Sequence, residues 1–571
     1  MAYPKERPGK LVIQLLAAAR LQFFIAKGPL SSRIGLHYQS RSRISKMTSD
    51  AIETRLFINN EFVQGKQGKT FKVYNPYNDQ EICHVHEATK EDVDLAVDAA
   101  EAAFPQWSSI AAHERAAYMF KFAQLVQRDA PQLAELDSMC MGKPVELLKK
   151  MDIPACVGVF NYFAGSGYHI LGESSLSSPN FLNVSVRQPY GVVGLIIPWN
   201  VPMIMFAFKV APALICGNTV VLKSSEKAPL SSIKLAALIK EAGFPPGVVN
   251  VVSGFGDPTG SAIGLHRKIR KISFTGSVAT GRKILKMAAD SNLKNVSLEL
   301  GGKSPAIIFE DADLEAAARY THYSINHNSG QHCQANSRVL VQESIADAYI
   351  DMVKKLMAKV TLGDPADPST FQGPQVDQKQ LAHIQRLVDQ GSKDGTLVCG
   401  GKRHGTTGAF IEPTILKNVP LDSAAYTEEI FGPVVILNTF KDEKEVLAEA
   451  NCTDFGLFSK DTQYTECITD PAAPLVPQSS TASVYTQNFD RAVRVAKALE
   501  AGAVGINCSV PVRAVDMPIG GWKQSGMGKE LSLHGLNTYT ELKTIFMKYN
   551  ADPTAMAVGT WHSGQQVDGI R

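Results

Sequence analysis

The sequence lacks the features that mark several classes of protein. Its nine cysteines include no Cys-x-x-Cys pair, which argues against a zinc site and a disulfide framework and fits a reducing compartment. A net charge of only +3 over 571 residues gives no reason to expect nucleic acid as a partner. The apolar stretch from Leu11 to Ala26 is interrupted by Arg20 and is too short to span a bilayer, so we expect no membrane partner. The dinucleotide fingerprint Gly-x-Gly-x-x-Gly is also absent.

Residues 1–46 differ from the rest of the chain in their charge. They carry nine Lys and Arg side chains and a single acid, Glu6, so that the segment is +8 and the remainder is −5. A basic segment that is nearly free of acids and rich in Ser and Arg is typical of a mitochondrial presequence. The alternative is a start site placed too far upstream, because Met47 would make a natural cytosolic beginning. In both cases we expect residues 1–46 to lie outside the fold. The protein is expected to be cytoplasmic or mitochondrial.

Apolar periodicity predicts alternating strands and helices from Leu56 onward. A chain of this length implies two or more domains. Strict alternation predicts an α/β fold, in which a parallel sheet has helices on both faces and its ligand site at the carboxyl ends of the strands. A second alternating block covers about 301–526. The expected strands lie at 55–58, 71–74, 192–197, 219–222, 248–252 and 272–274, and the expected helices follow Thr89 and cover 112–128 and 231–242.

Cys333 occupies a turn between a predicted helix at 314–326 and a predicted strand at 339–341. Only a few per cent of a free cysteine is thiolate at neutral pH, yet cysteine is a strong nucleophile. A lone cysteine is more often an inert core residue. Glu299 favours the catalytic interpretation, because this carboxylate ends a predicted strand and is followed directly by Gly301 and Gly302. Such a carboxylate is expected at a sheet edge over a cleft.

Two motifs carry a resemblance to a known family. Glu-Leu-Gly-Gly-Lys at 299–303, followed by Gly-Gln-x-Cys-x-Ala-x-Ser-Arg at 330–338, resembles the NAD(P)-dependent aldehyde dehydrogenase family. The resemblance covers about Leu56 to Tyr549. It implies oxidation of an aldehyde to a carboxylic acid with NAD, or with NADP as a further possibility. Cys333 would form a thiohemiacetal and then a thioester, which water activated by Glu299 hydrolyses.

The resemblance also implies a division of the chain into three parts. A Rossmann-like, parallel-sheet NAD-binding domain would comprise 52–170 and 190–300, and an α/β catalytic domain would comprise 301–532. A small β extension, 171–189 with 533–550, would make homodimers or homotetramers. The small, polar residues 551–571 are expected to form a disordered tail.

Further residues match the catalytic positions of the family. Asn200, which follows a predicted strand, would donate its side-chain amide to the oxyanion of the intermediate, alongside the backbone N–H of Cys333. Lys209 and Glu530 match a pair that relays protons, although the sequence alone would suggest a plain ion pair. The positions that match cofactor contacts are Ile196, Pro198, Trp199, Lys223, Glu226, Gly276, Ser277, Glu429 and Phe431.

The cofactor positions have a physical rationale. Gly276 and Ser277 join a predicted strand to a predicted helix, where small residues and free helix N–H groups suit a pyrophosphate, although an ordinary tight turn has the same sequence. The Glu226 carboxylate would accept hydrogen bonds from a ribose 2′-hydroxyl and repel a 2′-phosphate, which favours NAD over NADP. In the family, Glu429 holds the nicotinamide ribose and Phe431 packs near the ring.

Some positions depart from the family pattern. His332 and Gln334 make the wall beside the nucleophile more polar, and Gly505 replaces a large residue, which suggests room beneath the substrate tunnel. Ile519 stands where an aromatic side chain is common. Arg513 lies in the loop expected to close the tunnel, where it would suit an aldehyde that carries a carboxylate, although a solvent-facing arginine is the simpler interpretation. A semialdehyde dehydrogenase for acidic substrates is therefore an alternative function.

Residues 458–481 interrupt the catalytic block where the family runs directly into a strand. This segment is rich in Thr, Ser and Pro and has no clear periodicity, so it cannot add much core. It is either an inserted surface loop, which costs little beyond closure entropy, or translated intron, since Ser459-Lys460 can be encoded with a splice-donor sequence. The insertion leaves open a third function, a catalytically inactive structural or binding homologue.

Overall fold

The computed structural model describes residues 52–452, 481–509 and 514–549. The predictions made for residues 1–46, 458–480 and 551–571 and for Arg513 lie outside the described residues. Within the described ranges, no helix combines the length and the apolar character that a membrane crossing requires.

The first sheet contains eight strands in the order β19-β11-β10-β7-β8-β9-β1-β2. Its five central strands are parallel, and the strands at its two edges are antiparallel. From β7 the chain moves to β8 and β9 on one side and then to β10 and β11 on the other. In such sheets, ligands bind where the direction of strand addition reverses, outside the carboxyl ends of the strands. The strands are β1 (Leu56–Ile58), β2 (Glu61–Val63), β7 (Val192–Ile196), β8 (Thr219–Lys223), β9 (Val249–Val252), β10 (Lys271–Thr275), β11 (Asn295–Glu299) and β19 (Gly526–Met527).

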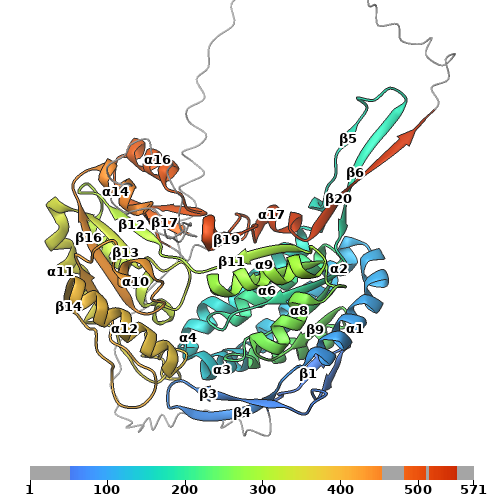
Figure 1. The fold of residues 1–571 in the computed structure, drawn as a ribbon, viewed down its shortest axis with the longest axis horizontal. Helices are drawn as coiled ribbons and strands as arrows, with labels where there is room; N and C mark the ends of the chain where they lie inside the picture. Colours follow the sequence, from blue (N-terminus) through green and yellow to red (C-terminus); the bar gives the residue numbers. More distant parts are fainter. Residues whose placement is uncertain (1–51, 453–480, 510–513, 550–571) are drawn as a thin grey trace, which may run out of the picture. The chain divides into compact units, whose positions relative to one another are not determined.

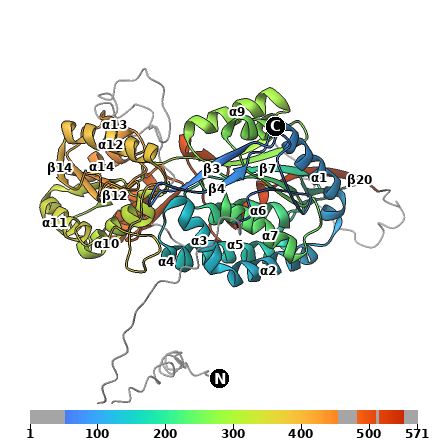
Figure 2. The same cartoon turned by 90° about the horizontal axis from the view of Figure 1, so that it is seen from below.

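Helices cover both faces of this sheet, as Figure 2 shows for α9 on one side of β7 and α6 on the other. Alternate residues of a strand point to opposite faces, so Val193 and Leu195 join the core with α6 whereas Val192 and Ile196 join the core with α9. The helices of the α9 face are α1 (Lys90–Ser109), α8 (Ser261–Leu265) and α9 (Val278–Ser291). Those of the α6 face are α2 (Ala112–Arg128), α3 (Ala130–Met141), α5 (Ile153–Gly165), α6 (Pro202–Ile215) and α7 (Leu230–Ala242).

The second sheet has seven strands in the order β14-β15-β16-β13-β12-β17-β18 and is parallel except for the β14–β15 pair. β17 begins at Thr481 and pairs with β12 on one side and β18 on the other, so the sheet is continuous at this point. Its strands are β12 (Pro305–Ile308), β13 (Arg338–Gln342), β14 (Thr396–Cys399), β15 (Thr414–Lys417), β16 (Val434–Phe440), β17 (Thr481–Tyr485) and β18 (Ala503–Ile506). The helices between them are α10 (Leu314–Asn326), α11 (Ala346–Met357), α12 (Gln378–Asp394), α13 (Ala424–Thr427), α14 (Glu443–Ala450) and α16 (Phe489–Ala498).

Two smaller sheets complete the described fold. β5 (Ser174–Ser175), β6 (Phe181–Pro189) and β20 (Thr540–Lys548) form an antiparallel ribbon that extends away from the first sheet (Figure 1), with β20 following the short helix α17 (Ser532–Asn537). β3 (Thr70–Asn75) pairs with β4 (Gln80–His86).

A five-residue connection joins the two large sheets. β11 ends at Glu299 and β12 begins at Pro305, so Leu300–Ser304 carries the chain from the carboxyl edge of the first sheet to the amino edge of the second. The loop between α10 and β13, which holds Cys333, lies at that same amino edge. The fold therefore brings the end of β11 and the Cys333 loop together.

Candidate active site

Cys333 and Glu299 are in contact. The Cys333 thiol points at Glu299 Oε1 with an Sγ–O distance of 3.8 Å, although the two residues come from different sheets. The loop before Cys333 is held in a tight conformation, with left-handed backbone at Asn328, Ser329 and Gly330. At Gly330 a Cβ atom would lie 2.1 Å from the Gly432 carbonyl, so only glycine allows the loop to approach this closely.

Burial and charge favour the protonated forms of both reacting groups. Burial raises the pKa of Glu299 to about 8, with the Glu530 carboxylate adding to the rise and the Lys209 ammonium opposing it. Burial, and then the negative charge of Glu299, raise the pKa of the Cys333 thiol well above its ordinary value. The resting nucleophile is therefore a neutral thiol, and Glu299 can accept the thiol proton in its ionised form.

Asn200 is attached to the Cys333 loop. Its side-chain amide donates to the Gln331 carbonyl at 3.0 Å, two residues before Cys333. Asn328 supports this arrangement by donating to the Asn200 carbonyl at 2.9 Å and to the Gln331 carbonyl at 3.1 Å. A side-chain amide has two N–H groups, so Asn200 retains a second donor for an oxyanion. Its predicted role stays a prediction.

Lys209 and Glu530 form a buried ion pair. Lys209 Nζ also donates to Ser273 Oγ at 3.0 Å, and Ser273 Oγ donates to Glu530 Oε1 at 3.2 Å. Burial pushes the pKa of Glu530 upward, but the Lys209 ammonium together with hydrogen bonds from Lys209, Glu299 and Ser273 holds it below the ordinary value. When Glu299 is protonated its carboxyl group hydrogen bonds the Glu530 carboxylate. The predicted relay pair is thus connected to Glu299.

The predicted phosphate site lies at the carboxyl edge of the first sheet. Ile196, at the end of β7, pairs with Lys223 on one side and with Phe274 on the other. Gly276 follows β10, and a Cβ atom there would lie 2.5 Å from the Phe274 ring. Ser277 caps α9, where its Oγ accepts the Thr280 N–H at 3.3 Å. This end of α9 is exposed and offers backbone N–H groups to an anion.

Lys223 and Glu226 lie beside that edge. Lys223 Nζ donates to the Ser224 carbonyl at 2.9 Å and lies 3.9 Å from Glu226 Oε2. Burial lowers the pKa of Lys223 to about 8. Glu226 retains 30% of its side-chain exposure and is open to a ligand from solvent.

Aromatic residues from the two sheets meet at the same place. Trp199 follows Pro198 in the turn after β7, and Phe431 precedes β16. Their rings pack edge to face with centroids 5.5 Å apart. Lys227 Nζ lies 5.3 Å from the Trp199 centroid. Both rings are only partly buried, so they form an accessible wall between the sheets.

Glu429 is held against the connection that follows Glu299. Its Oε1 accepts the Gly302 N–H at 2.9 Å, and a Cβ atom at Gly301 would lie 2.2 Å from its Oε2. Lys303 fixes the segment before Glu429, since its Nζ donates to the carbonyls of Ala425 and Glu428 at 2.7 and 2.5 Å. Burial raises the pKa of Glu429 to about 7. Glu429 thus ties the second sheet to the connection that follows Glu299.

Sequence reasoning missed three supporting residues. Lys303 stands inside the Glu-Leu-Gly-Gly-Lys motif, so its position was visible but its carbonyl partners were not. Ser273 is a polar residue between the apolar Ile272 and Phe274 of a buried strand, which is a detectable signal. Asn328 has no such signal, because its role depends on the turn that it occupies.

The structure shows the surroundings of three positions that depart from the family pattern. The His332 imidazole contacts the Ser324 carbonyl at 2.7 Å, and burial lowers its pKa to about 4, so the ring is neutral and tied to α10. The interpretation of Gly505 as leaving room is wrong. A Cβ atom there would lie 2.4 Å from the Cys508 carbonyl, so the backbone fills the space. Ile519 forms a β-bridge with Glu530 and lies beside the buried pair.

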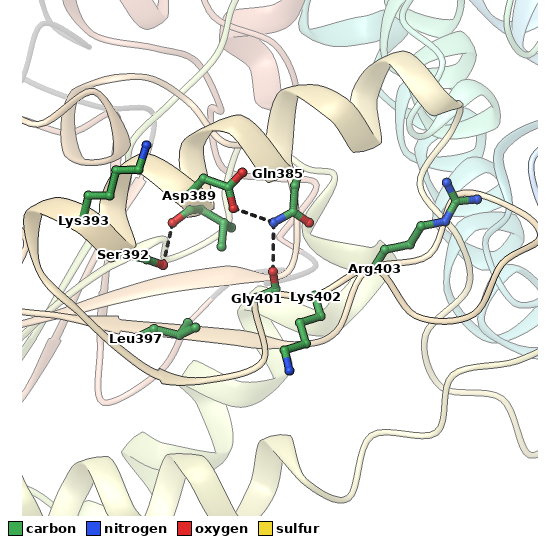
Figure 3. A pocket seen from close by; sticks show the side chains of 9 residues that line it. Gln385, Asp389, Ser392, Lys393, Leu397, Gly401, Lys402 and Arg403 are labelled. Carbon is green, nitrogen blue, oxygen red and sulfur yellow. Dashed lines mark hydrogen bonds between the residues drawn. The ribbon is translucent and has the colours of Figure 1, made fainter.

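The structure also has a surface hollow that is not part of the candidate active site. It is bordered by α12 and β14, and Figure 3 shows Asp389, Lys393 and Arg403 among the side chains around it. None of the predicted site residues lines it. The hollow is therefore separate from the chemistry described above.

Comparison with known proteins shows the family to which the chain belongs. The model of the aldehyde dehydrogenase family matches residues 62–462 and 476–545. The gap between the two matched ranges, 463–475, lies within the segment that sequence analysis singled out as an insertion. An aldehyde dehydrogenase of Emericella nidulans is 46% identical over 492 residues, which cover 86% of this chain and 94% of that protein.

A vertebrate protein and a solved bacterial structure are also similar to this chain. Aldehyde dehydrogenase 1A1 of Gallus gallus is 44% identical over 87% of this chain and 93% of its own. The NAD+ complex of aldehyde dehydrogenase from Bacillus cereus superposes with a TM-score of 0.81 at 40% identity and covers 87% of this chain and 97% of that one. The α/β fold predicted from the sequence is confirmed. The chain belongs to the aldehyde dehydrogenase family and is an oxidoreductase.

Proposed function

We propose that the protein oxidises an aldehyde to a carboxylic acid with NAD+. The observation that carries this proposal is the 3.8 Å contact between the Cys333 thiol and Glu299. It joins a nucleophile to a base at the sheet edge where the phosphate-binding turn also lies.

The chemistry of the chain's own residues follows from their positions. In its carboxylate form, Glu299 accepts the thiol proton as Cys333 Sγ attacks the aldehyde carbon, because the thiol is neutral at rest. The Asn200 amide and the Cys333 N–H stabilise the oxyanion of the thiohemiacetal. After oxidation a thioester links Cys333 to the acyl group. Glu299, having lost its proton, then activates a water that hydrolyses the thioester and frees the acid.

The described residues fit NAD. The Gly276–Ser277 turn at the start of α9 suits a pyrophosphate, the open Glu226 carboxylate suits a free ribose 2′-hydroxyl, and the half-buried Glu429 suits the nicotinamide ribose. Ile196, Pro198, Trp199, Lys223 and Phe431 would complete the binding surface. When bound, NAD+ supplies the hydride acceptor for the oxidation. A 2′-phosphate would meet the charge of Glu226, which favours NAD over NADP.

Neither alternative function gains support from the described residues. A catalytically inactive homologue would require a disrupted sheet, yet β17 keeps partners on both sides. The semialdehyde alternative depends on Arg513, which lies outside the described residues.

We also propose that the three parts of the chain predicted from the sequence have separate roles. Residues 52–170 and 190–300 would bind NAD, residues 301–532 would supply Cys333, and 171–189 with 533–550 would join subunits into homodimers or homotetramers. The three-stranded β5–β6–β20 ribbon supports the last part, since it carries exposed apolar side chains such as Leu542 and Phe546.

A panel of aldehydes tests the proposed function. We expect the full chain to produce NADH and the matching carboxylic acid in equal amounts with at least one aldehyde, and to work better with NAD than with NADP. NADH absorbance and chromatography of the acid measure the two products. An acidic semialdehyde belongs in the panel. A complete lack of NADH with every aldehyde and both cofactors would contradict the proposal.

The rate should depend on the protonation of Glu299. Because its pKa is raised to about 8, the active carboxylate form is scarce below pH 7 and grows as the pH passes 8, so kcat should rise over this range. Glu530→Gln removes the charge that adds to the raised pKa, and should move the rise in kcat to lower pH. The profile of kcat against pH measures both effects. A rise that stays at the same pH in Glu530→Gln would contradict the coupling of the two carboxyl groups.

A further inference from the structure

Two fully buried cations lie beside the segment that carries Glu429. They are Lys303, in the connection between the two large sheets, and Arg338, the first residue of β13. Burying a charged side chain is costly unless hydrogen bonds replace the lost water, so its partners indicate its role. The partners of both cations include α13, the short helix that leads directly into Glu429.

Lys303 holds the end of α13 through the carbonyl groups of the backbone. The last carbonyls of a helix have no partner within it. Lys303 Nζ donates to two of them, those of Ala425 and Glu428, at 2.7 and 2.5 Å. Because Glu428 directly precedes Glu429, these contacts fix the backbone from which the Glu429 carboxylate extends. Burial raises the pKa of that carboxylate, whereas the Gly302 N–H and the Lys303 charge lower it, so Lys303 also favours the ionised form.

Arg338 holds the same helix through a side chain. Arg338 Cζ lies 5.3 Å from the centroid of the buried Tyr426 ring, and Nη1 donates to the Tyr426 hydroxyl at 3.2 Å. Nε donates to the Lys303 carbonyl at 2.8 Å, so the two cations are linked. Nη1 and Nη2 also donate to the carbonyls of Glu449 and Ala450, at 3.2 and 3.1 Å. Arg338 therefore joins α13 to the connection and to the end of α14.

The backbone beyond α13 has a conformation that needs support. Phe431 has a φ of +54°, in the left-handed region that is strained for a bulky side chain. Such a conformation persists only where the surroundings hold it in place. Gln380 of α12 donates to the carbonyls of Ile430 and Phe431 at 3.3 and 3.1 Å. Side chains therefore bind the backbone both before and after Glu429.

We propose that Lys303 and Arg338 are positioning residues that fix the Glu429 carboxylate for the nicotinamide end of NAD. This inference rests on the proposed function, in which Glu429 suits the nicotinamide ribose. Loss of either cation should let α13 move and displace Glu429. Hydride transfer tolerates little displacement, because a reacting group misplaced by about 1 Å can slow a reaction on the order of 10²-fold.

The reactions of the thiol should be affected much less. The loop that holds Cys333 has its own contacts, since the side-chain amides of Asn200 and Asn328 both donate to the Gln331 carbonyl. A substitution of Lys303 leaves those contacts in place. We therefore expect hydride transfer to fall without an equal fall in acylation of Cys333 or in hydrolysis of its thioester.

Hydrolysis of an activated ester separates these effects. Cys333 can attack 4-nitrophenyl acetate and release nitrophenol, which forms an acetyl thioester that water activated by Glu299 hydrolyses. This reaction requires both residues but no NAD. In Lys303→Met the single-turnover rate of NADH formation at saturating NAD should fall on the order of 10²-fold. Ester hydrolysis in the absence of NAD should keep the rate of the unmodified protein.

Two further variants test the contacts of Arg338. Arg338→Lys keeps the charge but loses the planar fork of donors, so the same selective loss of NADH formation is expected. Tyr426→Phe keeps the buried ring and removes only the hydroxyl that Arg338 contacts. It should slow NADH formation by about three- to tenfold and leave ester hydrolysis unchanged. Because this change is small, Tyr426→Phe stays informative if the variants of the cations do not fold.

Lys294→Met is a matched control for a purely structural role. Lys294 is also a buried lysine, and its Nζ donates to the carbonyls of Gly264 and His266 at 2.6 and 2.9 Å. It precedes β11 and so lies at the opposite end of that strand from Glu299. Thermal unfolding should show a loss of stability in Lys294→Met, as in Lys303→Met, but both reaction rates should remain unchanged.

The outcomes distinguish this proposal from the proposed function. NADH formation at the full rate in Lys303→Met would overturn the proposal, as would an equal fall in NADH formation and ester hydrolysis. If Lys303→Met does not fold, an unchanged rate of NADH formation in Tyr426→Phe would overturn it. Failure of the proposed function would appear differently, as a lack of NADH in the unmodified protein.

Discussion

Replacing Cys333 with alanine is expected to abolish aldehyde oxidation, with a fall in kcat on the order of 10⁴-fold or more. In the proposed mechanism the thiol forms the only covalent bond to the substrate, and the Glu299 carboxylate that it contacts at 3.8 Å acts as the base. The rate of NADH formation at saturating aldehyde measures the loss. Substitution by the smaller methyl group should leave the fold intact, because Cys333 is only partly buried.

A matched variant shows whether the loss is specific. Cys399 is also a partly buried free thiol, but it lies on β14, away from the predicted site residues. Cys399→Ala should therefore keep the full rate. Cys333→Ala should still bind NAD with unchanged affinity in calorimetry, because the pyrophosphate turn belongs to the other sheet. Residual activity within tenfold of the unmodified protein would contradict the role of Cys333.

Local patterns predict the elements of this fold well. The helices expected at 112–128 and 314–326 begin and end at those residues in the structure, because each has an amphipathic face and a polar boundary. The helix expected after the Gly276–Ser277 turn is α9, which starts at Val278, directly after its Ser277 cap. Alternation of strands and helices was sufficient to predict a parallel sheet. It could not give the strand order, which depends on which way the chain turns after β9.

The same reasoning predicts only part of the candidate site. Ile196, Lys223 and Glu299 end strands of one parallel sheet, so their gathering at one edge follows from the topology. The contact of Glu299 with Cys333 does not, because it depends on how a second sheet packs against the first. Only the family resemblance anticipated that contact. Gly505 illustrates the opposite error, since a missing side chain suggested space that the Cys508 backbone occupies.

Replacing Glu299 with glutamine is expected to separate the two halves of the reaction. Glutamine has the same size and can hydrogen bond, but it cannot accept a proton, so hydrolysis of the thioester should slow by about 10²–10⁴-fold. Formation of the thioester should survive at a lower rate, because the thiol can lose its proton to solvent. We therefore expect a burst of about one NADH per active site, followed by very slow turnover.

The stalled state should be visible directly. Because the thioester accumulates, intact mass spectrometry of Glu299→Gln after the burst should detect the protein with one added acyl group, located on Cys333 by peptide mapping. Glu500→Gln is a suitable control, since Glu500 is a partly buried carboxylate that pairs with Lys523 and should not affect the burst or the steady rate. Steady turnover of Glu299→Gln at the unmodified rate would refute its role as the deacylating base. Slow turnover without a burst would instead mean that Glu299 is needed already for the attack of Cys333, as the direct thiol–carboxylate contact allows.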